Sequence, residues 1–142
     1  MFAFMWNPAW DTGVADIDQQ HHELLRRMGL LAAAIANGGE EAETERTLFH
    51  LSEYVDFHFK AEEDMMVQTS YLGLEAHRAV HDEMRSQVKA LVDSYLEEHK
   101  ILPASLMDYL ISWLIEHMDG EDRKLAGHLR KGPGYNQGAS PL

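Results

Sequence analysis

The sequence contains no cysteine in its 142 residues. This absence excludes a disulfide framework, an iron–sulfur cluster and a zinc site built from thiolates, and it agrees with a reducing compartment. No apolar run is long enough to cross a membrane. The first ten residues, MFAFMWNPAW, lack the basic residues that precede the apolar stretch of a secretory signal. We therefore expect a cytoplasmic protein without membrane insertion.

Basic residues are also scarce, with 12 lysines and arginines against 24 aspartates and glutamates and a formal net charge of −12. A surface this acidic repels phosphate backbones, so we expect no nucleic-acid partner. Hydrophobic residues make up 45% of the chain, which is enough for one core in one domain. The unusual number is nine histidines, and their positions must decide between surface residues and ligands.

Four segments show the apolar periodicity of helices. They span about Asp18–Ala36, Glu40–Met66, Leu74–Glu98 and Pro103–Arg130. Because short connections make neighbouring helices antiparallel, we predict an all-α fold, an up-down-up-down antiparallel four-helix bundle. Residues 1–131 would form this domain, with residues 1–17 as an N-terminal arm and residues 132–142 as a flexible C-terminal tail.

Polar residues interrupt the apolar stripe of every predicted helix, and they do so near one end of the bundle. The starts of the first and third helices meet the ends of the second and fourth there. A spacing of four places His58 with Glu62, and His77 with His81, on a shared helix face. Burying such groups without partners costs about 1–3 kcal/mol each, so we predict that they bind metal. The candidate ligands are His21, His58, Glu62, His77, His81, His117 and Asp122.

The fourth helix needs one irregular turn to bring its two candidates together. His117 and Asp122 are five residues apart, about 140° around a regular helix. The apolar stripe continues from Asp122 to Leu125, which indicates one inserted residue. A single-turn π-bulge at Met118–Asp122 would absorb that residue. Glu121 is the rival ligand at the regular spacing of four, but the positions that follow it on its face are polar, so we favour Asp122.

Five imidazoles and two carboxylates are too many ligands for one metal ion. Two ions with bridging carboxylates account for them. Nitrogen and oxygen donors without sulfur suit iron, manganese, zinc or copper, and the ligand set by itself does not choose among these metals.

Four motifs extend the pattern beyond the candidate ligands. They are Gly13-Val14 with Ile17-Asp18-Gln19-Gln20-His21, Tyr54 with His58-Phe59, Glu62-Glu63 and Met66, His77 with His81, and Trp113-Leu114 with His117 and Asp122. With these motifs, residues 6–130 resemble the hemerythrin family, particularly its single-domain bacterial members. Together the motifs are far more specific than any single pair of histidines.

The resemblance implies two iron ions, bridged by an oxo or hydroxo oxygen and by the two carboxylates. His77, His81 and His117 would hold one iron, and His21 and His58 would hold the other, which keeps one position open for dioxygen. The implied function is reversible dioxygen binding, as an oxygen carrier, store or local supplier rather than an enzyme. An oxygen-consuming enzyme is the partner that could receive the oxygen.

Reversible binding also requires a dry pocket, for which the neighbouring positions supply apolar side chains. Trp113 and Leu114 match family positions near the oxygen pocket. The expected lining residues are Leu24, Leu25, Met28, Trp113 and Leu114. Asp18 and Glu63 are candidates for orienting the imidazoles through hydrogen bonds. The remaining histidines, His22, His50, His99 and His128, are expected to lie away from the site.

Two alternatives use the same fold. The first is a di-iron oxidase or peroxidase, but ferritin-like oxidases rely on mostly carboxylate ligands with Glu-x-x-His pairs, and the sequence contains no such pair. The second is a nitric-oxide or oxygen sensor module that relies on a partner.

Overall fold

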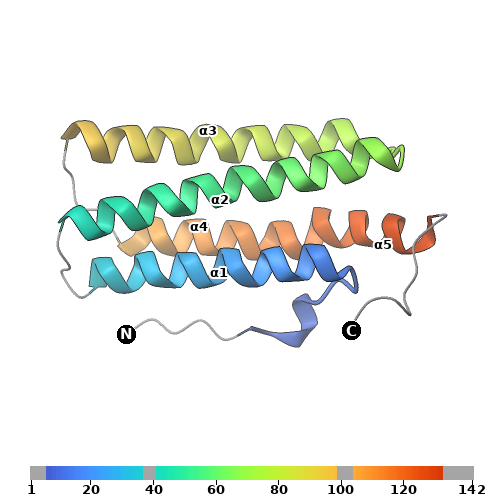
Figure 1. The fold of residues 1–142 in the computed structure, drawn as a ribbon, viewed down its shortest axis with the longest axis horizontal. Coiled ribbons are helices and arrows are strands. Elements are labelled where there is room, and N and C mark those ends of the chain that lie inside the picture. The colour runs from blue at the N-terminus through green and yellow to red at the C-terminus, as the bar shows by residue number, and fades with distance from the viewer. Residues whose placement is uncertain (1–5, 37–40, 99–103, 133–142) are drawn as a thin grey trace.

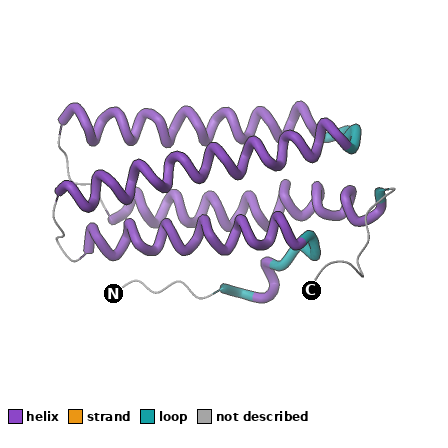
Figure 2. The backbone as a smooth tube through the Cα atoms, in the orientation of Figure 1, coloured by secondary structure: helices purple, strands orange, loops and turns teal. Residues whose placement is uncertain are grey.

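The computed structural model describes residues 6–36, 41–98 and 104–132. Within these ranges the chain is helical, with short loops and no strand (Figure 2). The elements are η1 Pro8–Trp10, α1 Ala15–Ala36, α2 Glu41–Gln68, α3 Leu74–Glu98, α4 Ala104–His117, η2 Met118–Asp122 and α5 Arg123–Lys131. Because η2 is a single π-helical turn, α4, η2 and α5 continue as one long helix (Figure 1).

The four long helices lie side by side and alternate in direction, as Figure 1 shows by colour along the chain. The predicted all-α, antiparallel four-helix bundle is therefore confirmed. Helix ends agree with the prediction to within about three residues, although the predicted starts at Glu40 and Pro103 lie outside the described residues. The division at residue 131 stays a prediction. No helix in the described ranges has both the length and the hydrophobicity required to cross a membrane.

The first helix begins at Ala15, earlier than predicted, because the Asp18 backbone N–H donates to the Val14 carbonyl at 3.0 Å and completes a first turn. The Asp18 carboxylate accepts hydrogen bonds from the Thr12 backbone N–H at 2.8 Å and from the Thr12 hydroxyl at 2.7 Å. Gly13 adopts a φ of +85°, a conformation that favours glycine, and this turns the chain into the helix. Asp18 therefore anchors the arm to the start of α1.

The N-terminal arm packs along the bundle. Trp6 and Trp10 contact the main apolar core and are partly buried. The Trp6 indole N–H donates to the Asp11 carboxylate at 2.8 Å. Arg130 of α5 donates to the Thr12 carbonyl, so the arm is also tied to the last helix.

The core consists of two apolar clusters with a polar layer between them. The larger cluster includes Leu24, and the smaller one includes Ile17 and Leu125. On α1, His21 lies between Ile17 and Leu24 in sequence and is fully buried. Asp122, also fully buried, precedes Leu125 by one turn. The polar layer is thus enclosed by hydrocarbon on both sides, which removes its charges from water.

Candidate metal centre

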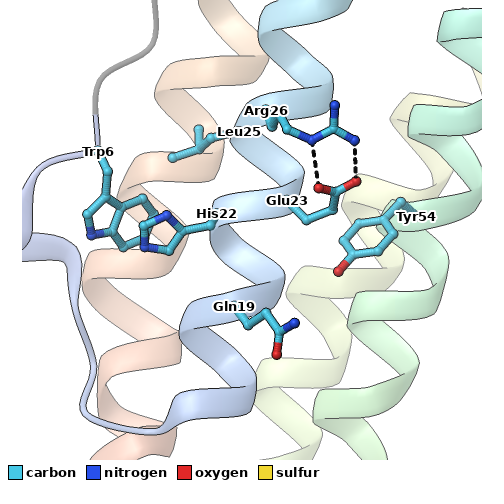
Figure 3. Close-up of a pocket in the computed structure, with 7 residues that line it drawn as sticks. All are labelled: Trp6, Gln19, His22, Glu23, Leu25, Arg26 and Tyr54. Carbon is cyan, nitrogen blue, oxygen red and sulfur yellow. Dashed lines mark hydrogen bonds and ion pairs between the residues drawn. The ribbon is translucent and has the colours of Figure 1, made fainter. Parts of the chain in front are cut away.

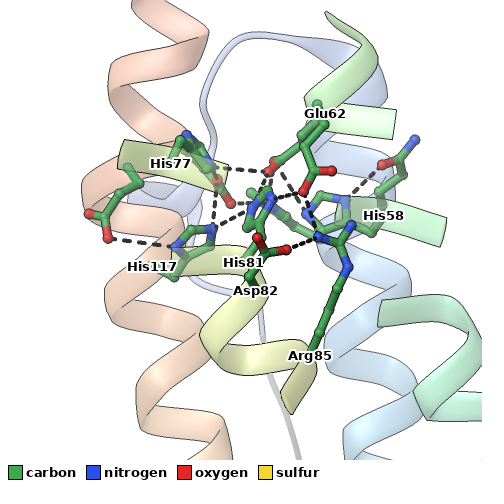
Figure 4. Close-up of polar contacts among 12 residues, drawn as sticks. His58, Glu62, His77, His81, Asp82, Arg85 and His117 are labelled. Atoms are coloured by element: carbon green, nitrogen blue, oxygen red, sulfur yellow. Dashed lines mark hydrogen bonds and ion pairs between the residues drawn. The ribbon is translucent and has the colours of Figure 1, made fainter. Parts of the chain in front are cut away.

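The seven polar residues predicted as ligands meet inside the bundle, and each has an exposed fraction of 2% or less. They come from every long helix: His21 from α1, His58 and Glu62 from α2, His77 and His81 from α3, His117 from α4 and Asp122 from η2. Figure 4 shows the labelled histidines and Glu62 directed toward one another. The convergence expected from the antiparallel topology is therefore present in the structure.

The seven residues form two groups that share the two carboxylates. One group contains His77, His81 and His117 with Glu62 and Asp122, and the other contains His21 and His58 with the same carboxylates. Within each group, one ligand atom from every residue lies within 4.8 Å of the others. Because Glu62 and Asp122 belong to both groups, each can bridge two ions.

All five imidazoles present their Nε2 atoms to the carboxylates. Around Asp122, the Nε2 atom of His21 lies 2.8 Å from Oδ2, and those of His77 and His117 each lie 3.0 Å from Oδ1. The Nε2 atoms of His81 and His117 are 3.1 Å apart. Two ring nitrogens this close can share at most one proton, whereas a cation between the rings would accept a lone pair from each.

Glu62 is surrounded in the same way. Its Oε2 atom lies 3.2 Å from Nε2 of His58, and its Oε1 atom lies 3.1 Å from Nε2 of His81 and 3.4 Å from Nε2 of His77. These separations are short, yet neither Glu62 oxygen has a partner with hydrogen-bond geometry. The carboxylate is therefore close to several nitrogens without being properly hydrogen-bonded to them.

Unsatisfied atoms are concentrated at this layer. Among the described residues, eight buried nitrogen or oxygen atoms of the seven side chains lack a hydrogen-bond partner. At about 1–3 kcal/mol for each such group, the arrangement is costly as a purely structural network. Metal ions would use these lone pairs, so the donor set fits a pair of cations bound by nitrogen and oxygen.

The irregular turn of the fourth helix decides which acidic residue reaches the cluster. The structure contains the predicted π-helical turn at Met118–Asp122, which confirms the predicted bulge. Asp122 is fully buried among the converging atoms. The Glu121 side chain is 38% exposed, and its Oε1 atom lies 3.6 Å from Nδ1 of His117, on the outer side of that ring. Asp122 rather than Glu121 therefore joins the buried group.

Hydrogen bonds at the outer ring nitrogens hold two imidazoles in orientation. The Oε2 atom of Glu63, as predicted, lies 2.8 Å from Nδ1 of His81, and it also accepts a hydrogen bond from Arg85 at 2.8 Å. Gln20 was missed by the sequence reasoning, and its Oε1 atom lies 2.7 Å from Nδ1 of His58. These contacts at Nδ1 leave Nε2 directed into the cluster.

The prediction for Asp18 was wrong. Its carboxylate accepts hydrogen bonds from Thr12 and Gly13 in the arm, and it orients no imidazole. The periodicity of one helix cannot separate these roles, because Asp18 and Gln20 both lie within one turn of His21. Only the position of α2 relative to α1 brings Gln20 to His58.

Burial and mutual charge set the protonation of the metal-free cluster. Burial opposes protonation of His21 and His77, but the adjacent carboxylates of Asp122 and Glu62 outweigh it and raise the pKa of each imidazole to about 9. Burial also opposes ionisation of Glu62, yet the charge of His58 and the close approach of the His21 ring hold the pKa of that carboxyl well below its usual range. Both carboxylates are therefore ionised.

An apolar cavity of about 20 Å³ adjoins the polar layer. Its volume is enough for one water-sized molecule. Four of the five predicted pocket residues, Leu24, Met28, Trp113 and Leu114, line it. The other described residues that line it are Leu48, Leu51, Val55, Phe59, Met84, Val88 and Leu110. Among the described residues, the Trp113 indole is therefore the only polar side chain that reaches the cavity.

Two aromatic rings connect this cavity with the cluster. Phe59 stacks on His81 with 4.0 Å between ring centroids and 9° between planes. Trp113 stacks on His117 with 4.9 Å between centroids and 13° between planes. Both aromatic residues also line the cavity, so its wall is in contact with the imidazoles on one side.

Leu25, the fifth predicted pocket residue, lies elsewhere. It is buried against the core but lines a separate surface groove of about 520 Å³ on the outer face of α1, together with Trp6, His22 and Tyr54 (Figure 3). The reason is angular, since Leu25 is about 100° around the helix from Leu24. Leu25 therefore does not line the cavity formed by the other four predicted pocket residues, and the prediction for this residue is corrected.

The histidines predicted to lie off the site are outside the cluster wherever the structure describes them. His22 is exposed and stacks on Trp6 with 3.7 Å between ring centroids. His50 is exposed and lies 3.5 Å from Glu53. His128 is half-buried, with its Nε2 atom 3.1 Å from the Thr69 carbonyl oxygen. His99 lies outside the described residues.

Comparison with known proteins places this geometry in a family. The model of the "Hemerythrin HHE cation binding domain" matches residues 12–129. A bacteriohemerythrin of Clostridium acetobutylicum is 26% identical, over 85% of this chain and 97% of that protein. A myohemerythrin of Riftia pachyptila is 26% identical, over 89% and 93% of the two chains. A crystal structure of wild-type hemerythrin superposes with a TM-score of 0.83 at 25% identity, over 89% of this chain and 97% of that one.

Proposed function

The chain belongs to the hemerythrin family, and on that premise we propose that its buried cluster holds two iron ions and binds dioxygen reversibly. The observation that carries the proposal is the pair of ligand groups with shared carboxylates and unequal numbers of imidazoles. His77, His81 and His117 would hold one ion, and His21 and His58 the other. With one imidazole fewer, the second ion would keep a coordination position that no side chain of its group fills.

When bound, the reduced iron pair supplies the electrons that hold dioxygen. The protein's own part is to fix the donors and to keep water away. Gln20 and Glu63 hold the rings of His58 and His81 so that their Nε2 atoms face inward. Leu24 and Leu114 contribute to an apolar cavity beside the cluster, and the described residues that line this cavity offer a bound guest no strong proton donor.

Metal loading of the metal-free protein should release protons. His21 and His77 carry protons at pH 7.5, because their pKa values are raised to about 9, and coordination requires neutral rings. We expect release of roughly two protons per chain and a metal affinity that rises with pH up to about 9. Isothermal titration calorimetry with zinc, in two buffers of different ionisation enthalpy, measures this release. Equal heats in both buffers would contradict the prediction.

Protonation of His21 and His77 opposes metal binding, but it stabilises the fold of the metal-free protein. A raised imidazole pKa contributes stability that is fully present below about pH 6.5 and is lost as the pH rises through about 9. Below neutral pH, the protons on His21 and His77 would stabilise the fold. Above neutral pH, the bound metal would take over this stabilisation.

The proposed function is tested by oxygen cycling together with metal analysis. The protein is loaded with iron, reduced without oxygen, exposed to oxygen and then placed under vacuum. Two irons per chain and an absorption band that appears and disappears over several cycles support the proposal. A single irreversible oxidation with release of peroxide would instead indicate an oxidase. A chain that takes up no iron from an iron-rich medium overturns the proposal.

A further inference from the structure

Two valines separate the internal cavity from a surface groove. The groove lies between α2 and α3 and has a volume of about 360 Å³. Val55 of α2 and Val88 of α3 line this groove and also line the apolar cavity inside the bundle. Their exposed fractions are 6% and 9%. A single layer formed by these two valine side chains therefore separates the surface groove from the internal cavity.

The antiparallel register of α2 and α3 places this layer in line with the cluster. Arg85 pairs with Asp56 at 3.0 Å, and His81 pairs with Glu62 at 3.1 Å. Because the helices are antiparallel, each step forward along α2 faces a step backward along α3. Val55 and Val88 occupy one level. Glu62 lies seven residues beyond Val55, about 10 Å along the helix axis.

The intervening level is filled by Phe59 and Met84, which also line the cavity. A small molecule that passes the valines therefore enters a space whose far wall is the Phe59 ring stacked on His81. The path from groove to cluster is short and apolar along its inner part, which suits a neutral diatomic molecule and disfavours ions.

Arg85 closes the groove on the side toward the cluster. Its guanidinium contacts Asp56 and Glu63 of α2 and Asp82 of α3, and it lies 5.5 Å from the centroid of the Phe59 ring. Figure 4 shows Arg85 extending along the outside of the cluster near Asp82. With that end bridged by ion pairs, the valines are the part of the groove floor that opens directly onto the cavity.

We propose that dioxygen reaches the cavity between Val55 and Val88, through transient displacement of these side chains. The inference rests on the proposed function, because it names the route to the same site. It makes the two valines determinants of the rate of oxygen exchange, with no part in holding the bound molecule.

The first test uses Val88→Phe and Val88→Ala, with oxygen binding and release measured by stopped flow. If oxygen passes between the valines, a substitution of Val88 should change the rate constants of binding and release by the same factor and leave Kd unchanged. We expect Val88→Phe to slow both, on the order of tenfold, because overpacking raises the barrier to side-chain displacement. Val88→Ala should accelerate both. Unchanged rates in both variants, or a change in Kd carried by one rate alone, would overturn the proposal.

Val92→Phe is the matched control. Val92 lies one turn further along α3, is partly buried against the same core, and lines neither the groove nor the cavity. The same change in size there should leave both rate constants as they are. A slowing equal to that of Val88→Phe would assign the effect to general tightening of the bundle and would count against the route.

A second measurement separates the route from the proposed function. In zinc-loaded protein with Trp6→Phe and Trp10→Phe, the cavity residue Trp113 is the one remaining tryptophan. Dissolved dioxygen quenches its fluorescence by collision, without any iron chemistry. Val88→Phe should reduce the quenching rate constant and Val92→Phe should not. This result would support the route even if oxygen cycling failed, and equal quenching in both variants would overturn it.

Discussion

Replacing His77 with alanine is expected to remove half or more of the bound metal and to lower the free energy of unfolding by about 3–5 kcal/mol. The Nε2 atom of His77 lies 3.0 Å from Asp122 and 3.4 Å from Glu62, and the residue is 2% exposed. Without the ring, one ion loses a ligand and two buried carboxylates lose a neighbouring donor. Metal analysis and denaturant unfolding of the loaded protein measure both effects.

His22→Ala provides the control for this change. His22 is exposed, stacks on Trp6 and lies on the same helix as the candidate ligand His21. Its loss should leave the metal content unchanged and reduce stability far less. Full metal occupancy in His77→Ala would remove His77 from the site and would weaken the assignment of the whole group.

Leu114→Ala should accelerate irreversible oxidation of the oxygen-loaded protein several-fold. Leu114 is 2% exposed and lines the apolar cavity beside the cluster. The shorter side chain enlarges the cavity, so water can enter and supply protons to the bound guest. A loss of about 2–5 kcal/mol in stability should accompany the change. The decay of the oxygen-loaded absorption band at constant temperature gives the rate.

Leu129→Ala separates wetting of the cavity from general destabilisation. Leu129 is buried in the smaller apolar cluster, on the other side of the polar layer, and does not line the cavity. Its truncation should cost similar stability with little effect on the oxidation rate. If the two variants oxidise equally fast, loosened packing rather than the cavity wall controls the rate.

Much of the architecture could be predicted from periodicity alone. A helix repeats its faces every 3.6 residues, so the apolar stripes fixed four helices, and the polar interruptions marked one level of the bundle. The same counting located the π-helical turn, because the stripe before His117 and the stripe after Asp122 differ by one residue. It also favoured Asp122 over Glu121, which the structure leaves 38% exposed.

Contacts between helices could not be predicted in this way. Asp18 and Gln20 lie three residues and one residue before His21, yet Gln20 contacts His58 and Asp18 turns to the arm. Leu25 resembles Leu24 in type and position, yet it lines the outer groove. In each case the outcome depends on the rotation of one helix relative to its neighbour, and a repeat within one helix carries no information about that rotation.

The sequence by itself therefore determined the bundle, the level at which seven polar side chains interrupt its core, and the irregular turn that buries Asp122, because these follow from the geometry of single helices and their order along the chain. Only the tertiary structure decided which apolar residues enclose the cavity, which polar groups orient His58 and His81, and that Val55 and Val88 separate the cavity from the surface. These features arise where side chains of different helices meet, and close packing, rather than periodicity, sets those contacts.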